Sequence, residues 1–88
     1  MNESMAARSI DEIDIRKEIE SFPGSIFSAR KIKRRIIDKY GLYLDQRQEH
    51  SLGSKIGDIL SRMNDEGLLS VYLRSDSRHP IRYIRLRS

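Results

Sequence analysis

The two histidines of this 88-residue chain are its residues best suited to acid–base or metal chemistry, yet they stand far apart in the sequence. His50 and His79 fall in different predicted loops, and without any cysteine the chain shows no spacing typical of a zinc site. Gly53 and Gly57 stand inside a predicted helix, whereas a phosphate-binding loop places its glycines between a strand and a helix. We therefore expect no enzyme activity, no cofactor, no bound metal and no small-molecule ligand.

The basic residues are more informative, because they are unevenly distributed. Residues 1–24 hold three Lys and Arg against six Asp and Glu, whereas residues 25–88 hold fourteen against seven. This excess, in a chain of net charge +4 and pI near 9.7, favours a polyanionic partner such as nucleic acid. A soluble surface that is simply rich in charge fits the composition equally well. The choice between these two interpretations depends on which predicted helices and strands carry the basic residues.

The N-terminal part of the chain predicts a tail and one helix. Residues 1–9 are small and polar and are expected to form a flexible tail before a single domain over residues 10–88. Ser9 and Glu12 fit a capping box, which predicts a first helix from Ile10 to Glu20. Its isoleucines spread wider than one stripe, which favours either simple burial or contact with a second subunit.

Two further helices are predicted in the middle of the chain. The second runs from Ala29 to Lys39, between a cap at Ser28 and a stop at Gly41. The third ends before Gly67, and its start stays open between residues 46 and 51, because two caps compete there: a capping box of Asp45 with Gln48, or Ser51. Its apolar residues share one helical face, as a core-facing helix requires. They are Leu52, Ile56, Ile59, Leu60 and Met63.

The rest of the chain predicts extended structure. Residues 25–27 form a short extended piece, and side chains alternate between apolar and polar over residues 69–73 and 81–87. A short polar loop joins the last two segments, which predicts a hairpin. The expected fold is α+β, with three helices and a C-terminal β-hairpin.

This order of elements resembles the winged helix-turn-helix family, of the small prokaryotic, archaeal or viral regulator type. The second helix, SxxKIKRRIIDKYG, and the third, LGSKIGDILSRMNDEGLLSVYL, carry the resemblance, which covers residues 10–87. The family's signature is a third helix that ends in L…(D/E)GLL and runs straight into the first strand of the hairpin, called the wing. The chain departs from the family in its link between the second and third helices, about nine residues where three or four are usual.

The resemblance implies that the third helix enters the major groove of DNA with its N-terminal half facing the bases. Arg suits guanine, Gln suits adenine and Ser suits either, so the residue types are appropriate. The alternative is a solvated polar face. Asp58 opposes phosphate contact, and it either accepts a hydrogen bond from a cytosine amino group or pairs with Arg62. The candidate residues are Arg47, Gln48, His50, Ser51, Ser54 and Lys55.

Phosphate contacts are expected first from the start of the second helix. Ser28, Arg30 and Lys31 offer a hydroxyl, two cations and free backbone N–H groups at the positive end of a helix. Arg34 lies one turn further along and is a fourth candidate.

The hairpin is the second expected source of phosphate contacts. The resemblance implies that its cations face the minor groove or the phosphates beside it, and arginine suits bidentate phosphate pairing. The alternative is a charged edge strand that prevents aggregation, a role that would suffice for Arg85 and Arg87. The hairpin candidates are Arg74, Arg78, His79 and Arg82.

We therefore predict a DNA-binding transcriptional regulator, acting as a homodimer through its acidic, isoleucine-rich first helix and located with the nucleoid in the cytoplasm. Two alternatives remain: an architectural chromatin protein without sequence preference, and a winged-helix protein-interaction module that binds no DNA. No apolar run approaches the length of a transmembrane helix. The N-terminus lacks the apolar segment of a secretory signal, so no membrane partner is expected.

Overall fold

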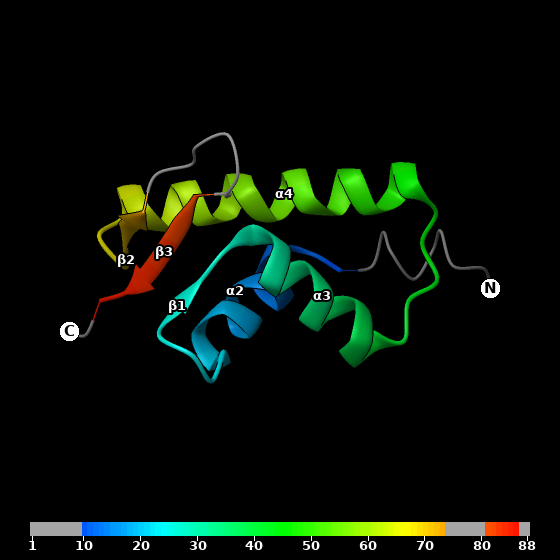
Figure 1. The fold of residues 1–88 in the computed structure, drawn as a ribbon, viewed down its shortest axis with the longest axis horizontal. Helices are drawn as coiled ribbons and strands as arrows, with labels where there is room; N and C mark the ends of the chain where they lie inside the picture. The colour runs from blue at the N-terminus through cyan, green and yellow to red at the C-terminus, as the bar shows by residue number, and fades with distance from the viewer. Residues whose placement is uncertain (1–9, 74–80, 87–88) are drawn as a thin grey trace.

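A computed structural model describes residues 10–73 and 81–86 of the chain. Within these ranges, three helices and a three-stranded antiparallel sheet follow one another in the predicted order, so the α+β class is confirmed (Figure 1). The predicted tail, residues 1–9, lies outside the described residues. The elements are α2 (Glu12–Ser21), β1 (Ile26–Phe27), α3 (Ala29–Tyr40), α4 (Gln46–Asp65), β2 (Leu69–Leu73) and β3 (Arg82–Arg85).

The sheet has the order β1-β3-β2, so the last strand of the chain lies at its centre. Ile84 of β3 lies opposite Ile26 of β1 on one side and opposite Ser70 of β2 on the other. The second strand of the hairpin is shorter than the predicted residues 81–87, although the backbone N–H of Leu86 still donates to the carbonyl of Leu68. The hairpin of β2 and β3 is therefore joined to β1 through β3.

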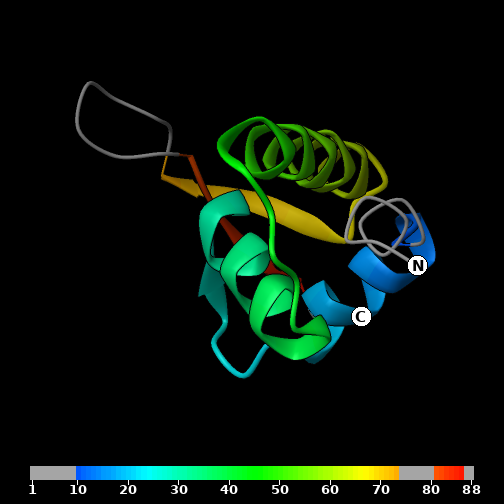
Figure 2. The ribbon, with the colours of Figure 1, turned by 90° about the vertical axis from the view of Figure 1, so that its right-hand side faces the viewer.

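The three helices pack against one another, and α4 also packs against β2 of the sheet. Figure 2, which looks along α4, shows α2 and α3 side by side beneath it, and each of the three helices contacts the other two. The predicted apolar stripe of α4 is buried in this arrangement, as are Phe27, Leu69 and Tyr83 of the sheet. Tyr83 has a raised phenol pKa, mainly because burial disfavours its charged form.

The ends of α3 and α4 follow from local sequence. Ser28 caps α3, and Gly41 ends it with a φ of 59°, a left-handed conformation that favours glycine. Asp45 and Gln48 form the capping box of α4, which settles the open start of this helix at residue 46. The link between α3 and α4 is therefore only the five residues 41–45, and the longer link expected from the sequence is wrong.

The predicted start of α2 is also wrong. The helix begins two residues later than expected, because Asp11 and not Ser9 provides the cap. The side chain of Asp11 accepts from the backbone N–H of Asp14, and the side chain of Asp14 accepts in return from the backbone N–H of Asp11, each at 3.2 Å. Ile10 precedes the helix and is buried in the core.

The isoleucines of the N-terminal region are mostly accounted for by burial within this chain. Ile10, Ile15 and Ile19 lie in the core, whereas the side chain of Ile13 is 63% exposed. None of the described helices combines the length and apolar character that crossing a membrane requires.

Candidate nucleic-acid interface

The basic side chains divide into those that have partners within the chain and those that do not. Arg16 of α2 belongs to the first group: its guanidinium donates to both carboxylate oxygens of Glu66, at 2.9 and 3.0 Å, and to Glu12 at 2.9 Å. Arg62 of α4 also bonds to Glu12. The hydrogen bonds that Arg16 donates to Glu66 and Glu12 raise the pKa of Arg16, and those that Arg62 and Arg16 donate to Glu12 lower the pKa of Glu12. These four residues tie α2 to the carboxyl end of α4.

A buried carboxylate ties α2 to α3. The side chain of Glu18 is 1% exposed and accepts a 2.9 Å hydrogen bond from Arg35 and a second hydrogen bond from Lys39. Burial raises the pKa of Glu18, but the hydrogen bonds from Lys39 and Arg35 outweigh it and hold this pKa below its ordinary value. This arrangement is not evident from the sequence, because an acidic residue on a surface helix carries no local sign that it will be buried.

Arg85 of β3 is also occupied within the chain. Its guanidinium donates to the backbone carbonyls of Ile19, Phe22 and Gly24, at 2.8, 2.9 and 3.3 Å, and lies 5.8 Å from the centre of the Phe27 ring. These carbonyls belong to the end of α2 and to the turn that follows it, which would otherwise need water or another donor. Arg85 therefore joins the sheet to α2, which is more than the edge protection considered from the sequence.

Lys55, a candidate for base contact, also has a partner within the chain. Its Nζ donates to the backbone carbonyl of Ile10 at 2.8 Å, which fixes the segment that leads into α2. Lys33 of α3 lies 3.6 Å from the carboxylate of Glu49, with the side chain of Lys33 22% exposed. Lys55 is thus held by the backbone without an ion pair to a described residue, whereas Glu49 partly neutralises Lys33.

The second group of basic residues is exposed and unpaired within the described part of the chain. Arg30, Lys31 and Arg34 are all on α3, and Arg47 is in the first turn of α4. None of the four makes an ion pair with another described residue, nor does Lys17 on the exposed side of α2. Four of these five cations are therefore candidates named from the sequence.

The other candidates at the start of α3 and α4 differ in accessibility. Ser28 is only 5% exposed, and its Oγ accepts from the backbone N–H of Lys31 at 3.4 Å, so its hydroxyl serves mainly as a helix cap. Gln48 is half-buried and its side chain belongs to the capping box of Asp45. The remaining three, which are His50, Ser51 and Ser54, are exposed on α4.

The hairpin candidates are described only in part. Arg82, at the start of β3, is half-buried and makes no ion pair with another described residue. Arg74, Arg78 and His79 lie outside the described residues.

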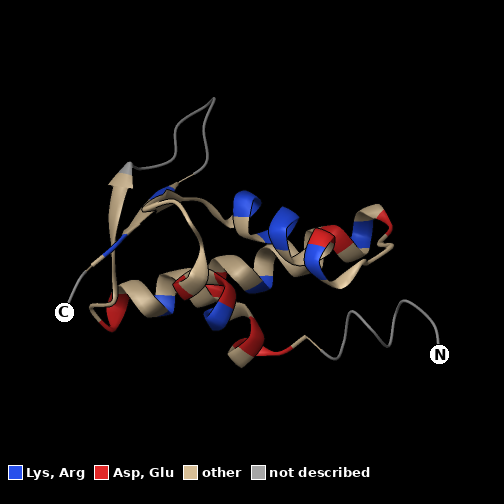
Figure 3. Ribbon diagram, turned by 90° about the horizontal axis from the view of Figure 1, so that it is seen from below, with Lys and Arg blue, Asp and Glu red and all other residues tan. Residues whose placement is uncertain are grey.

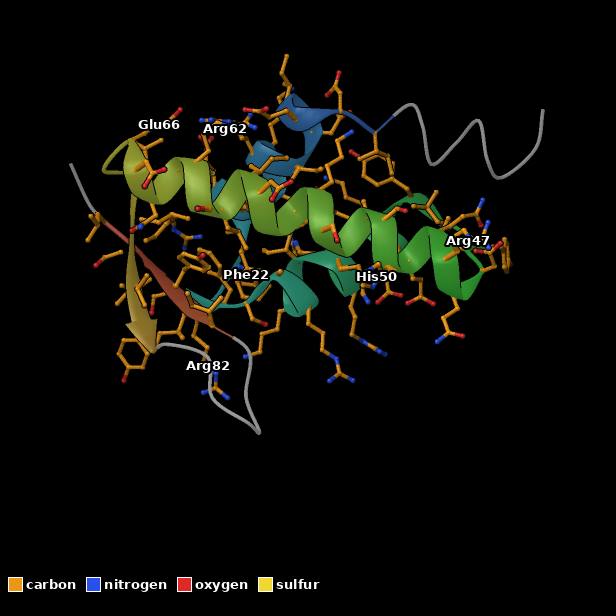
Figure 4. All side chains as sticks on the ribbon, turned by 90° about the horizontal axis from the view of Figure 1, so that it is seen from above. Phe22, Arg47, His50, Arg62, Glu66 and Arg82 are labelled. Atoms are coloured by element: carbon orange, nitrogen blue, oxygen red, sulfur yellow. The ribbon has the colours of Figure 1, made fainter. Side chains whose placement is uncertain are left out.

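Acidic residues are concentrated on one side of the molecule. Figure 3 shows Asp and Glu over α2 and the carboxyl end of α4, whereas the first turns of α3 and the strand β3 carry Lys and Arg on the opposite side. Further Asp and Glu lie among the basic residues near the end of α3 and the start of α4. In Figure 4, Arg62 and Glu66 lie with α2 on one side of α4, and Arg82 lies on the other. The unpaired cations Arg30, Lys31, Arg34, Arg47 and Arg82, on α3, the first turn of α4 and the start of β3, are together called the cationic surface below.

Acidic residues limit which part of α4 can approach a polyanion. Asp58 and Asp65 are exposed in its second half, and the predicted pairing of Asp58 with Arg62 is wrong, because Arg62 bonds to Glu12 instead. No group of three His, Cys, Asp or Glu is assembled to hold a metal ion in the described ranges. The arrangement can therefore bind an anion through the first half of α4, the start of α3 and the start of β3.

Comparisons of the chain with protein-family models, with curated proteins and with solved structures found no match.

Proposed function

We propose that the protein binds double-stranded DNA through the cationic surface and acts as a winged-helix transcriptional regulator. The observation that carries this proposal is the division of the basic residues. Those facing α2 are neutralised by carboxylates or held by backbone carbonyls, whereas Arg30, Lys31, Arg34 and Arg47 are exposed and unpaired among the described residues. Unpaired cations that share one surface attract a polyanion, because binding releases the counterions of its phosphates.

The element order supports the winged-helix part of the proposal. The chain passes from α4 through Gly67, with a φ of 82°, directly into β2, and β3 pairs with both β1 and β2. In this proposal α4 enters the major groove with Arg47, His50, Ser51 and Ser54 facing the bases. A nucleoid-associated location in the cytoplasm follows from the same proposal.

Phosphates would be held on both sides of the groove. Arg30, Lys31 and Arg34 of α3 are one set of contacts, together with the backbone N–H groups at the start of this helix. The second set of phosphate contacts comes from the hairpin. It includes Arg82, and Arg74, Arg78 and His79 remain sequence-based candidates for it.

Charge removal with a matched control tests DNA binding. The double substitution Arg30→Gln with Lys31→Gln removes two phosphate contacts, so it should weaken binding to every duplex and make the slope of log affinity against log salt shallower by roughly 2. Fluorescence anisotropy with a labelled duplex at several salt concentrations measures both quantities. Lys17→Gln removes one exposed charge from α2 and should lower affinity by much less than half of this effect. Equal effects of the two changes would show that binding does not use the cationic surface.

The architectural alternative is favoured by one observation on α4. Its exposed side chains beyond the first turn include the short Ser51, Ser54 and Ser61, and Lys55 is held by the carbonyl of Ile10, so few long donors can reach base edges. Arg47→Ala separates the two roles. A regulator should lose its preference for its selected duplex over a random one, whereas an architectural protein should bind both more weakly by the same factor. A protein-interaction module would bind no duplex even at low salt.

Dimerisation through α2 is a separate part of the proposal, and it depends on one exposed apolar residue. Because Ile13 is 63% exposed while its neighbouring isoleucines are buried, it is the natural centre of such a contact. Ile13→Glu should convert a dimer into a folded monomer in sedimentation equilibrium. A native protein that is already monomeric at tens of micromolar would contradict dimerisation through α2.

A further inference from the structure

A shallow hollow lies where α3 meets the start of α4, beside the cationic surface. Its volume is about 290 Å³, and Lys33, Gln46, Glu49 and His50 line it. This volume is at the lower end of small-molecule sites, which begin at roughly 300 Å³, so it suits a single ring system better than a larger ligand. In Figure 4, His50 faces the junction of the two helices.

The side chains that line the hollow keep most of their hydrogen-bonding capacity. Lys33 Nζ and Glu49 Oε1 are 3.6 Å apart, which is longer than a charge-assisted hydrogen bond of roughly 2.8 Å. The side chains of Gln46 and His50 have no partner among the described residues. The hollow therefore presents one cationic donor, one carboxylate and two groups that both donate and accept.

The charges of the hollow select a neutral ligand over a phosphate. Lys33 and Glu49 balance each other, and a phosphate would be repelled by the carboxylate. Two of the unpaired cations are sequence neighbours of lining residues, since Arg34 follows Lys33 in α3 and Arg47 follows Gln46 in α4, each about 100° further around its helix. A nucleic acid held by a phosphate on Arg34 and by a base on Arg47 would bring its neighbouring bases close to the hollow.

We infer that this hollow binds an unpaired nucleobase, with preference for guanine, and so directs the protein to duplex DNA that ends in or contains single-stranded nucleotides. The Watson–Crick edge of guanine has an acceptor, O6, beside two donors, N1–H and the 2-amino group. Lys33 donates to O6, and the carboxylate of Glu49 accepts from the two donors. Adenine presents an amino group to the ammonium and a lone pair to the carboxylate, so it is rejected.

The inference rests on the proposed function, and overhang duplexes separate the two. The probes are a blunt labelled duplex and the same duplex with a one-nucleotide 3′ overhang of guanosine, inosine or adenosine, compared by anisotropy at one salt concentration. We expect the guanosine overhang to bind roughly tenfold more tightly than the adenosine overhang or the blunt duplex. Inosine, which lacks the 2-amino group, should give an intermediate affinity.

Substitution of the carboxylate assigns the preference to the hollow. Glu49→Gln should abolish the ratio of guanosine to adenosine affinity, and the matched change Glu20→Gln on the exposed face of α2 should preserve it. The ratio cancels the general gain in affinity for DNA that follows removal of any negative charge. Native protein that binds blunt and overhanging duplexes equally would overturn the inference and leave the proposed function standing. A guanosine preference that survives Glu49→Gln would also overturn the inference. Failure of the native protein to bind any duplex would contradict both the inference and the proposed function.

Discussion

At the scale of single residues, Glu18 is the unusual charge, because it is buried while its two partners reach water. The side chains of Arg35 and Lys39 are 39% and 57% exposed. Removing one member of a fully buried ion pair lowers the free energy of unfolding by roughly 4 kcal/mol. The decrease is smaller here, because water can hydrate the exposed cations once the carboxylate is gone. We expect Glu18→Gln to lower the free energy of unfolding by about 2 kcal/mol, measured by urea denaturation. The neighbouring exposed change Glu20→Gln should stay within about 0.5 kcal/mol, and an equal loss in both variants would contradict the assignment.

Arg85 is a second residue whose role depends on geometry that lysine cannot reproduce. Its planar guanidinium reaches three carbonyls at the end of α2 and in the turn after it, whereas an ammonium carries its three donors on one nitrogen and cannot span them. Arg85→Lys should therefore destabilise the fold by about 2 kcal/mol in the same denaturation experiment, although charge is conserved. Arg82→Lys on the same strand is the control, since its side chain makes no hydrogen bond within the described residues. Stability unchanged by Arg85→Lys would mean that water satisfies these carbonyls equally well.

At the scale of elements, the sequence predicts what depends on neighbouring residues and misses what depends on distant ones. The cap at Ser28, the stop at Gly41 and the apolar stripe of α4 are local signals, and all are confirmed. The start of α2 differs from the prediction because Asp11, two residues after Ser9, forms its own capping box with Asp14. The partners of Glu18, Arg85 and Lys55 come from other elements, so no spacing along the chain could reveal which cations are free.

The capping box of α4 links element stability to the candidate interface. Asp45 holds the first turn, which carries Arg47 and leads into His50. Asp45→Ala should cost about 1 kcal/mol in stability and speed amide hydrogen exchange over residues 46–50 more than elsewhere in α4. Asp58→Ala makes the same chemical change in mid-helix, where no cap is lost, and should leave exchange at the start of α4 unchanged. Uniformly faster exchange along the helix would instead indicate a global effect.

At the scale of the whole molecule, ion pairs join the helices while leaving one side of the protein positive. Arg16, Arg62 and Glu66 connect α2 with α4, and Glu18 connects α2 with α3. Glu12 and Glu18 of α2 are therefore used to assemble the fold, and the exposed cations without a partner in the described ranges lie on the cationic surface, apart from Lys17. This division explains how a chain with a modest net charge of +4 can present an exposed basic surface.

The same ion pairs make stability depend on pH in a predictable direction. The pKa of Glu12, of Glu18 and of Glu66 is held below the ordinary value of 4.5, by hydrogen bonds from arginine and, for Glu18, also from Lys39 despite opposing burial. A carboxyl whose pKa is lower in the folded than in the unfolded state stabilises the fold above the unfolded value and loses this contribution as pH falls through the folded value. The free energy of unfolding should therefore be level from neutral pH to about 5 and decline below about 4.5.

Urea denaturation at a series of pH values measures this decline, and Glu18→Gln provides the comparison. The variant cannot protonate at that position, so its stability should start lower at neutral pH and fall less steeply on acidification, and the two curves should converge. Glu20→Gln should follow the native curve throughout. A native protein whose stability rises on acidification, or a Glu18→Gln curve parallel to the native one, would show that this carboxylate is not held ionised by its partners in α3.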